Sequence, residues 1–173
     1  STAASNITTQ SPNYPTAGTN SLADQLKIVA RLVAGGLQTK VYMVSLGGFD
    51  NHSAQVDAAN TTTGTHADLL SKVSVAVKAF MDDLAFLGVD ERVVGLTFSE
   101  FGRRIKSNSS DGTDHGAAAP MFVFGNAVQS GMLGVNPTIP ATVATSDNIP
   151  MQYDFRSVYA SILQDWLCVP SAD

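Results

Sequence analysis

Cysteine and charged residues are both scarce in this chain of 173 residues, which has one cysteine and 14% charged residues. A single cysteine, Cys168, cannot form a disulfide within the chain. No apolar stretch reaches the about 20 residues that a membrane-spanning helix needs. Acidic residues outnumber Lys and Arg by 15 to 10, and the basic residues form no run. The sequence therefore predicts no intrachain disulfide, no transmembrane segment and no nucleic-acid partner.

The chain does contain enough apolar residues for one core, since 44% of its residues are hydrophobic. Low charge combined with abundant Ser, Thr, Asn and Gly is more common in exported proteins than in cytosolic ones. We therefore expect an exported protein, located in the periplasm, at the cell surface or outside the cell. Residues 1–20 contain no Asp, Glu, Lys or Arg and mix Ser, Thr, Asn and Pro, which predicts an extended polar lead-in.

Hydrophobic periodicity beyond residue 20 predicts helices that alternate with short buried strands. A helix is expected to begin at Ser21, where Ser-Leu-Ala-Asp forms a capping box, and to end at Gly35 and Gly36. The same reasoning predicts strands at residues 41–46, 92–98 and 121–124, and further helices at residues 65–87 and 154–167. Strands that alternate with long helices indicate crossover connections. The expected fold class is therefore α/β, with a mostly parallel sheet and helices on both of its faces.

Polar, glycine-rich segments flank the predicted strands. They are residues 47–52 (Gly-Gly-Phe-Asp-Asn-His), 99–104 (Ser-Glu-Phe-Gly-Arg-Arg) and 112–116 (Gly-Thr-Asp-His-Gly). In open α/β sheets, ligands bind just beyond the carboxyl ends of the strands. Imidazole and carboxylate groups bind divalent metals, and glycines let the backbone bend so that such groups converge. The candidate metals are zinc, manganese, iron and calcium, and the candidate ligands are Asp50, His52, Glu100, Asp114 and His115.

A structural role is the alternative for each of these segments, because an aspartate in a glycine-rich segment often caps the backbone of a turn. Arg103 is a candidate clamp for an oxyanion such as phosphate or sulfate, although paired arginines also form plain surface ion pairs. His66 precedes a predicted helix and is expected to cap it. The chain has no Gly-x-Ser-x-Gly elbow and no Gly-x-x-x-x-Gly-Lys loop, which argues against a serine hydrolase and a nucleotide-binding protein.

Four motifs in this order resemble the carboxyl-terminal half of the bacterial family catalogued as domain of unknown function 1501. Three are the segments at residues 47–52, 99–103 and 112–116, the last with Pro120, and the fourth runs from Asp154 to Leu167. Members of that family are exported bacterial proteins, and the family is similar in fold to the alkaline phosphatase and sulfatase superfamily. The resemblance implies that residues 21–173 form the carboxyl-terminal half of an alkaline-phosphatase-like α/β domain.

By that resemblance, Asp50 and His52 match the superfamily's aspartate and histidine ligands of one metal, and His115 matches the later histidine that completes the site. The spacing differs, because the superfamily places its Asp and His about one helical turn apart. Ser99 and Glu100 stand where the superfamily has an Asp-His pair. The superfamily's first metal-binding aspartate and its Ser or Thr nucleophile belong to an amino-terminal half that we do not expect within these residues.

The resemblance implies an exported, metal-dependent hydrolase of the phosphatase or sulfatase type that acts on phosphate or sulfate esters. The alternative is a non-catalytic secreted or cell-surface binding protein that keeps the fold with a degenerate metal site. A partner is also expected, either a second chain or the amino-terminal half of the same protein. Without it, the strands at residues 41–46 and 92–98 would expose edges and apolar faces. The competing possibility is a self-sufficient small α/β domain, for which the length is adequate.

Overall fold

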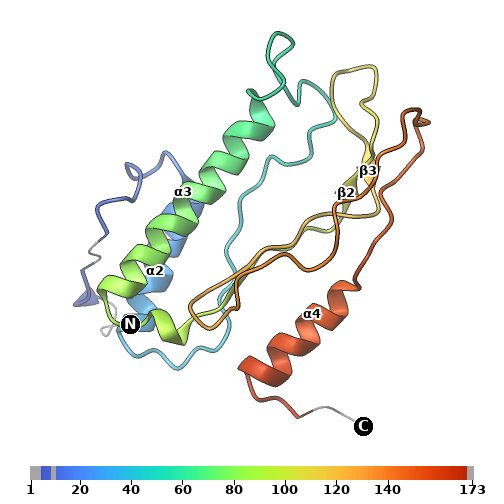
Figure 1. The fold of residues 1–173 in the computed structure, drawn as a ribbon. Helices are drawn as coiled ribbons and strands as arrows, with labels where there is room; N and C mark the ends of the chain where they lie inside the picture. The colour runs from blue at the N-terminus through green and yellow to red at the C-terminus, as the bar shows by residue number, and fades with distance from the viewer. Residues whose placement is uncertain (1–4, 9–10, 171–173) are drawn as a thin grey trace.

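The computed structural model describes residues 5–8 and 11–170, so part of the predicted lead-in lies outside the described residues. Two long helices, α2 (Ser21–Ala34) and α3 (Thr65–Phe86), pack side by side (Figure 1). The other elements are the 3-10 helix η1 (Asp90–Arg92), the strands β1 (Gly95–Leu96), β2 (Gly102–Arg103), β3 (His115–Gly116) and β4 (Val123–Phe124), the helix α4 (Phe155–Ser161) and the π-helix η2 (Ile162–Trp166). None of the helices in this described part is long and apolar enough to cross a bilayer.

Helix α2 begins at Ser21, as the sequence predicts, but the preceding residue caps it. The side-chain oxygen of Asn20 accepts a hydrogen bond from the Ala23 N–H at 3.3 Å, and its amide donates to the Lys72 carbonyl in α3 at 2.9 Å. Asn20 thus satisfies a backbone donor that the helix itself leaves free. It also ties the start of α2 to α3, which explains why this polar side chain is buried.

The core lies between α2 and α3. Its buried members recur at helical spacing on the facing sides of the two helices: Leu22, Leu26, Val29, Ala30 and Val33 in α2, and Ala76, Phe80 and Leu84 in α3. Ala30 and Ala76 are fully buried, and such small side chains let two helix backbones approach closely. Tyr42, Val44 and Leu46 pack against this core from the extended segment at residues 41–46. The helices predicted from periodicity are therefore confirmed here.

The predicted α/β fold, with a mostly parallel sheet and helices on both faces, is wrong. Among the described residues, β1 pairs antiparallel with β4, and β2 pairs antiparallel with β3. Each of these sheets has two strands of two residues. Residues 41–46 are extended but pair with no other strand in the described part of the chain. The large sheet on which an alkaline-phosphatase-like fold depends is therefore not formed by these residues.

The apolar run at residues 41–46 is buried on one side only. Its alternate side chains face the core, whereas Val41 and Met43 are 69% and 80% exposed. The side chain of Gln25 in α2 makes hydrogen bonds to the backbone of this segment, as a neighbouring strand would do. Its amide nitrogen donates to the Ser45 carbonyl at 2.8 Å, and its oxygen accepts from the Ser45 N–H at 3.1 Å. A continuous apolar run predicts burial on both faces, but only one face is covered.

The predicted carboxyl-terminal helix forms, but it buries none of its residues. The Asp154 side chain caps α4 by accepting a hydrogen bond from the Arg156 N–H at 2.9 Å, and the chain continues into η2. Phe155 and Leu163 are exposed. Figure 1 shows α4 standing apart from α2 and α3. Of the apolar face that periodicity assigns to the core, Phe155 is exposed, and Val158, Ile162 and Trp166 are only half-buried.

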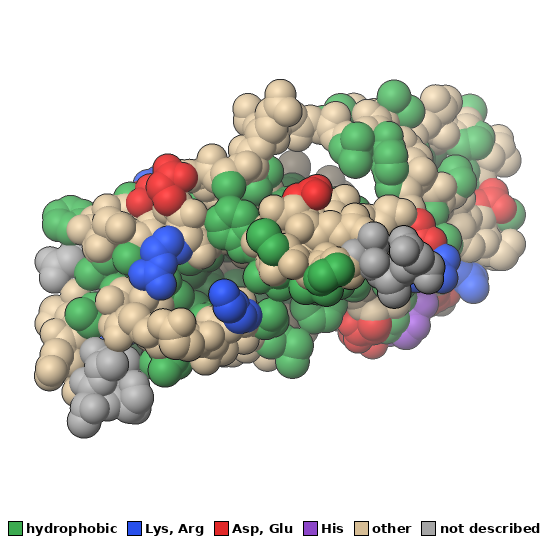
Figure 2. All heavy atoms as spheres, turned by 90° about the horizontal axis from the view of Figure 1, so that it is seen from below, with side chains coloured by type: hydrophobic (Ala, Val, Ile, Leu, Met, Phe, Trp, Pro, Cys, Tyr) green, Lys and Arg blue, Asp and Glu red, His purple; other side chains and the backbone are tan. Residues whose placement is uncertain are grey.

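Exposed apolar side chains also lie on segments outside the helices. They support the expectation of a partner, which stays a prediction. Val41, Met43, Phe98 and Phe122 are each more than half exposed, and Figure 2 shows apolar side chains on the face seen from below. Large apolar surfaces are commonly covered by another polypeptide. We expect light scattering after gel filtration to give a native mass well above the 18.1 kDa of one chain.

The matched variant is Met43→Lys, which places a charge on the most exposed of these side chains and should reduce the association without unfolding the helices. Native mass spectrometry would distinguish a second, different chain from another copy of this one. A stable, unaggregated monomer at all concentrations would contradict the prediction and support a self-sufficient small domain.

Candidate metal centre

Two loops that are far apart in the sequence are joined by backbone hydrogen bonds. The N–H groups of Ala54, Gln55 and Thr113 donate to the carbonyls of Ser110, Asp111 and Asn51, over 2.9 to 3.1 Å. A little further along, β2 pairs with β3, which sets Arg103 opposite His115. These contacts fix the segments at residues 47–55 and 108–116 relative to each other. The candidate ligands on both segments are thereby brought to one place.

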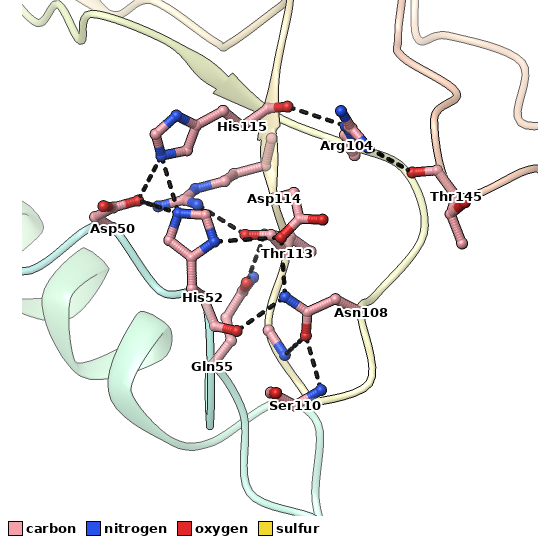
Figure 3. A network of polar contacts seen from close by, with 12 residues as sticks. Asp50, His52, Gln55, Arg104, Asn108, Ser110, Thr113, Asp114, His115 and Thr145 are labelled. Atoms are coloured by element: carbon pink, nitrogen blue, oxygen red, sulfur yellow. Dashed lines mark hydrogen bonds and ion pairs between the residues drawn. The ribbon is translucent and has the colours of Figure 1, made fainter.

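Asp50, His52 and His115 converge at the surface between these loops (Figure 3). The Nε2 atoms of the two histidines are 2.9 Å apart and lie 3.1 and 3.0 Å from Asp50 Oδ1. The three side chains are between 47% and 57% exposed, and Figure 2 shows histidine beside acidic and basic side chains at one edge of the molecule. Within the described residues, these three form the one group whose ligand atoms lie close enough to hold a metal ion. Their predicted convergence is confirmed.

The two imidazole rings are held by different contacts. His52 Nδ1 lies 3.2 Å from Asp114 Oδ1, so that the other ring nitrogen, Nε2, faces Asp50 and His115. The ring of His115 stacks on Phe101, with centroids 3.6 Å apart and planes inclined by 17°. One ring is therefore oriented by a hydrogen bond and the other by packing.

Arg103 joins three segments around the carboxylate ligand. Its Nη1 donates to the Thr113 carbonyl at 2.7 Å, and its Nη2 donates to the Phe49 carbonyl at 2.8 Å and to Asp50 Oδ1 at 2.5 Å. The planar fork of a guanidinium suits this kind of multiple contact. These bonds orient the carboxylate of Asp50 toward the histidines. The role of Arg103 as a clamp for a substrate oxyanion stays a prediction.

Hydrogen bonding keeps both carboxylates of the site in their charged form. The pKa of Asp50 lies below its ordinary value: loss of hydration raises it, but hydrogen bonds from His115 and Arg103 outweigh that effect. The pKa of Asp114 is lowered as well, mainly by the hydrogen bond from Asn108. A charged carboxylate is the form that binds a metal and that accepts a hydrogen bond from an imidazole.

The other two candidate ligands lie outside this group. Asp114 contacts the far side of the His52 ring, away from the point where the three ligand atoms meet. Glu100 is exposed, and the hydroxyl of its neighbour Ser99 lies 3.5 Å from its carboxylate. The structure therefore brings three of the five predicted ligands together and places Asp114 directly behind one of them.

His66 does not act as the cap that its position predicts. It lies in the first turn of α3, whose cap residue is Gly64 without a side-chain hydrogen bond. The His66 ring instead meets the Phe49 ring edge-on, with centroids 6.1 Å apart. The third histidine of the chain is therefore separate from the other two.

Asn108 is a residue of the site that the sequence analysis missed. Its amide nitrogen donates to the His52 carbonyl at 2.9 Å and to Asp114 Oδ1 at 3.1 Å. Its oxygen accepts from the N–H groups of Ser110, at 2.9 Å, and Gly112, at 3.2 Å. The nearby Ser, Asp and Gly residues indicate an Asx-type turn, which is a signal for the local bonds. The bond to His52 spans 56 positions of the chain, and no local pattern could have predicted it.

A family model described as "Protein of unknown function (DUF1501)" matches residues 4–163 of the chain. No curated protein matches the chain, and no solved structure does. The matched range includes all three residues of the ligand group together with Asp114 and Asn108.

Proposed function

We propose that this chain, which belongs to the family described as Protein of unknown function (DUF1501), is an exported, divalent-metal-dependent hydrolase of phosphate or sulfate esters. The observation that carries this proposal is the convergence of Asp50 Oδ1, His52 Nε2 and His115 Nε2 to within 3.1 Å of one another. Hydrolytic metal sites commonly use three protein ligands of this kind and leave a position open. The small proportion of charged residues, 14%, supports export.

The donor set of Asp50, His52 and His115 fits a transition metal. Calcium prefers six to eight oxygen ligands, so two imidazoles make it a poor fit. Two imidazoles and one carboxylate suit zinc, manganese and iron alike.

The charges around the site suit an anionic ester. A divalent metal held by Asp50, His52 and His115 would supply Lewis acidity toward an ester oxygen and toward water. Asp50 would offset one of its two positive charges, and the two histidines would bind it as neutral rings. Arg103 and Arg104 add positive charge, since their guanidinium groups contact Asp50 Oδ1 at 2.5 Å and the His115 carbonyl at 3.2 Å. A surface of this sign attracts phosphate or sulfate groups.

The exposure of the ligand group favours hydrolysis over oxygen chemistry. Non-haem iron oxygenases also bind iron through two histidines and one carboxylate on one face of the metal. Their reactive intermediates, however, need a site that excludes water. The ligand side chains here are between 47% and 57% exposed, so water reaches them from the surface. A reaction that consumes water suits such a site.

Metal content and hydrolysis, measured on the same preparation, test this proposal. We expect mass spectrometry of the elements to find about one zinc, manganese or iron ion per chain, in line with the donor set. Hydrolysis of para-nitrophenyl phosphate or para-nitrophenyl sulfate should stop after dialysis against a chelator and return when one of these metals is added. Tight metal binding without hydrolysis would instead support a non-catalytic binding protein, and no metal binding would refute the site.

A further inference from the structure

The ring of His52 lies between Asp50 and His115 on one side and the carboxylate of Asp114 on the other (Figure 3). Its two ring nitrogens therefore face different partners. Nε2 faces His115 Nε2 at 2.9 Å and Asp50 Oδ1 at 3.1 Å, whereas Nδ1 faces Asp114 Oδ1 at 3.2 Å. A neutral imidazole carries one N–H and one lone pair. The position of the proton therefore decides whether His52 can offer Nε2 to a metal.

Asp114 favours one of the two tautomers of His52. A charged carboxylate can only accept hydrogen bonds, so it repels a lone pair on Nδ1 and attracts an N–H there. Asp50 Oδ1 also faces this ring, at 3.1 Å from Nε2, but it already accepts hydrogen bonds from Arg103 Nη2 and His115 Nε2. The contact with Asp114 at 3.2 Å therefore favours the ring with its proton on Nδ1. The lone pair is then left on Nε2, which points toward Asp50 and His115.

Asn108 holds the carboxylate of Asp114, which is the acceptor for His52 Nδ1. Two backbone N–H groups, those of Ser110 and Gly112, donate to the Asn108 oxygen, so its nitrogen must face the other way. That nitrogen donates to Asp114 Oδ1 at 3.1 Å and to the His52 carbonyl at 2.9 Å. Asp114 Oδ1 therefore receives one donor from Asn108 and has room for a second from His52. Backbone groups, which cannot reverse, thus set the direction of the hydrogen bonds that Asn108 makes.

We propose that Asp114 is a positioning residue, which holds His52 in the Nδ1–H tautomer and so prepares Nε2 for the metal. This inference rests on the metal site of the proposed function. It assigns to Asp114 a role other than the ligand role that the sequence suggests. His115 stacks on Phe101 at 3.6 Å instead, so the effect of Asp114 is specific to His52.

The tautomer can be read directly by long-range proton–nitrogen NMR of the metal-free protein at about pH 8, above the usual pKa of histidine. We expect His52 in the unmodified chain to carry its proton on Nδ1. In Asp114→Ala the acceptor is gone, so the Nε2–H tautomer should appear, and the manganese affinity measured by calorimetry should fall about 10- to 100-fold. In Asp114→Asn the amide oxygen can still accept from Nδ1, so the tautomer and most of the affinity should return.

The matched control is Asp68→Ala, which removes an aspartate from the first turn of α3 and should change neither readout. A proton on Nε2 of His52 in the unmodified chain would overturn the proposal, as would an unchanged tautomer in Asp114→Ala. If Asp114→Ala does not fold, the unmodified chain and Asp114→Asn still give the decisive spectra. A chain that binds no manganese but has Nδ1–H on His52 would refute the proposed function and support the assignment of the tautomer.

Discussion

Replacing His115 by alanine is expected to lower the manganese affinity by more than about 100-fold, because the loss of a direct ligand exceeds the effect of a supporting residue. The change removes the Nε2 atom of His115, which is one of three ligand atoms that lie 2.9 to 3.1 Å apart. Asp50 and His52 alone leave too few ligands to retain the ion. Calorimetry with manganese measures the affinity, and the hydrolysis of para-nitrophenyl phosphate and para-nitrophenyl sulfate should fall below detection.

The third histidine provides a control for this experiment. His66→Ala makes the same chemical change in the first turn of α3, outside the ligand group. It should leave manganese binding within about twofold of the unmodified chain, since the His66 ring contacts Phe49 and supplies no ligand atom. Equal losses in the two variants would show that the affinity depends on general stability. Unchanged binding in His115→Ala would remove this residue from the site.

Replacing Gly112 by alanine is expected to have the second large effect, about 3 kcal/mol or more of destabilisation. A Cβ atom at residue 112 would lie 2.2 Å from the carbonyl carbon of His52 and 2.4 Å from both its oxygen and the Ser53 nitrogen. These are backbone atoms, which cannot rotate away. The loops would have to separate, and the hydrogen bond from Thr113 to Asn51 would break. The same movement would carry His52 away from His115 and weaken manganese binding.

Gly47→Ala is the matched control, because it makes the same substitution at the start of the other loop. No atom lies within 4 Å of the position that its Cβ would take, and its φ is not in the left-handed region. We expect it to change the free energy of unfolding by less than about 0.5 kcal/mol. Urea denaturation followed by circular dichroism compares the two variants. Equal tolerance of alanine at both glycines, or an equal loss of stability in both variants, would contradict the steric clash at residue 112.

The sequence by itself determined the two long helices. Apolar residues at three- and four-residue steps predicted helices at residues 65–87 and from Ser21 to Gly35, and the structure has Thr65–Phe86 and Ser21–Ala34. These signals are local, because a helix satisfies its own backbone and its periodicity shows which side will be buried. The residue types of the metal site were equally visible, since histidine and aspartate in glycine-rich loops are recognisable without a fold.

Only the tertiary structure decided how the extended segments are used. The run at residues 41–46 looks like a strand buried on both faces, yet Gln25 bonds its backbone and Val41 stays exposed. A strand needs a neighbour for its hydrogen bonds, and the identity of that neighbour is not encoded in the run itself. The prediction of a parallel sheet failed for this reason.

The same distinction applies to the site. The sequence offered five candidate ligands, and the pairing of β2 with β3 and of the two loops selected Asp50, His52 and His115. The place of Asp114 behind the His52 ring depends on contacts across 62 positions of the chain. Local sequence fixes which groups are available, but distances of a few ångströms between distant segments are set by the packing and backbone hydrogen bonds of the whole fold.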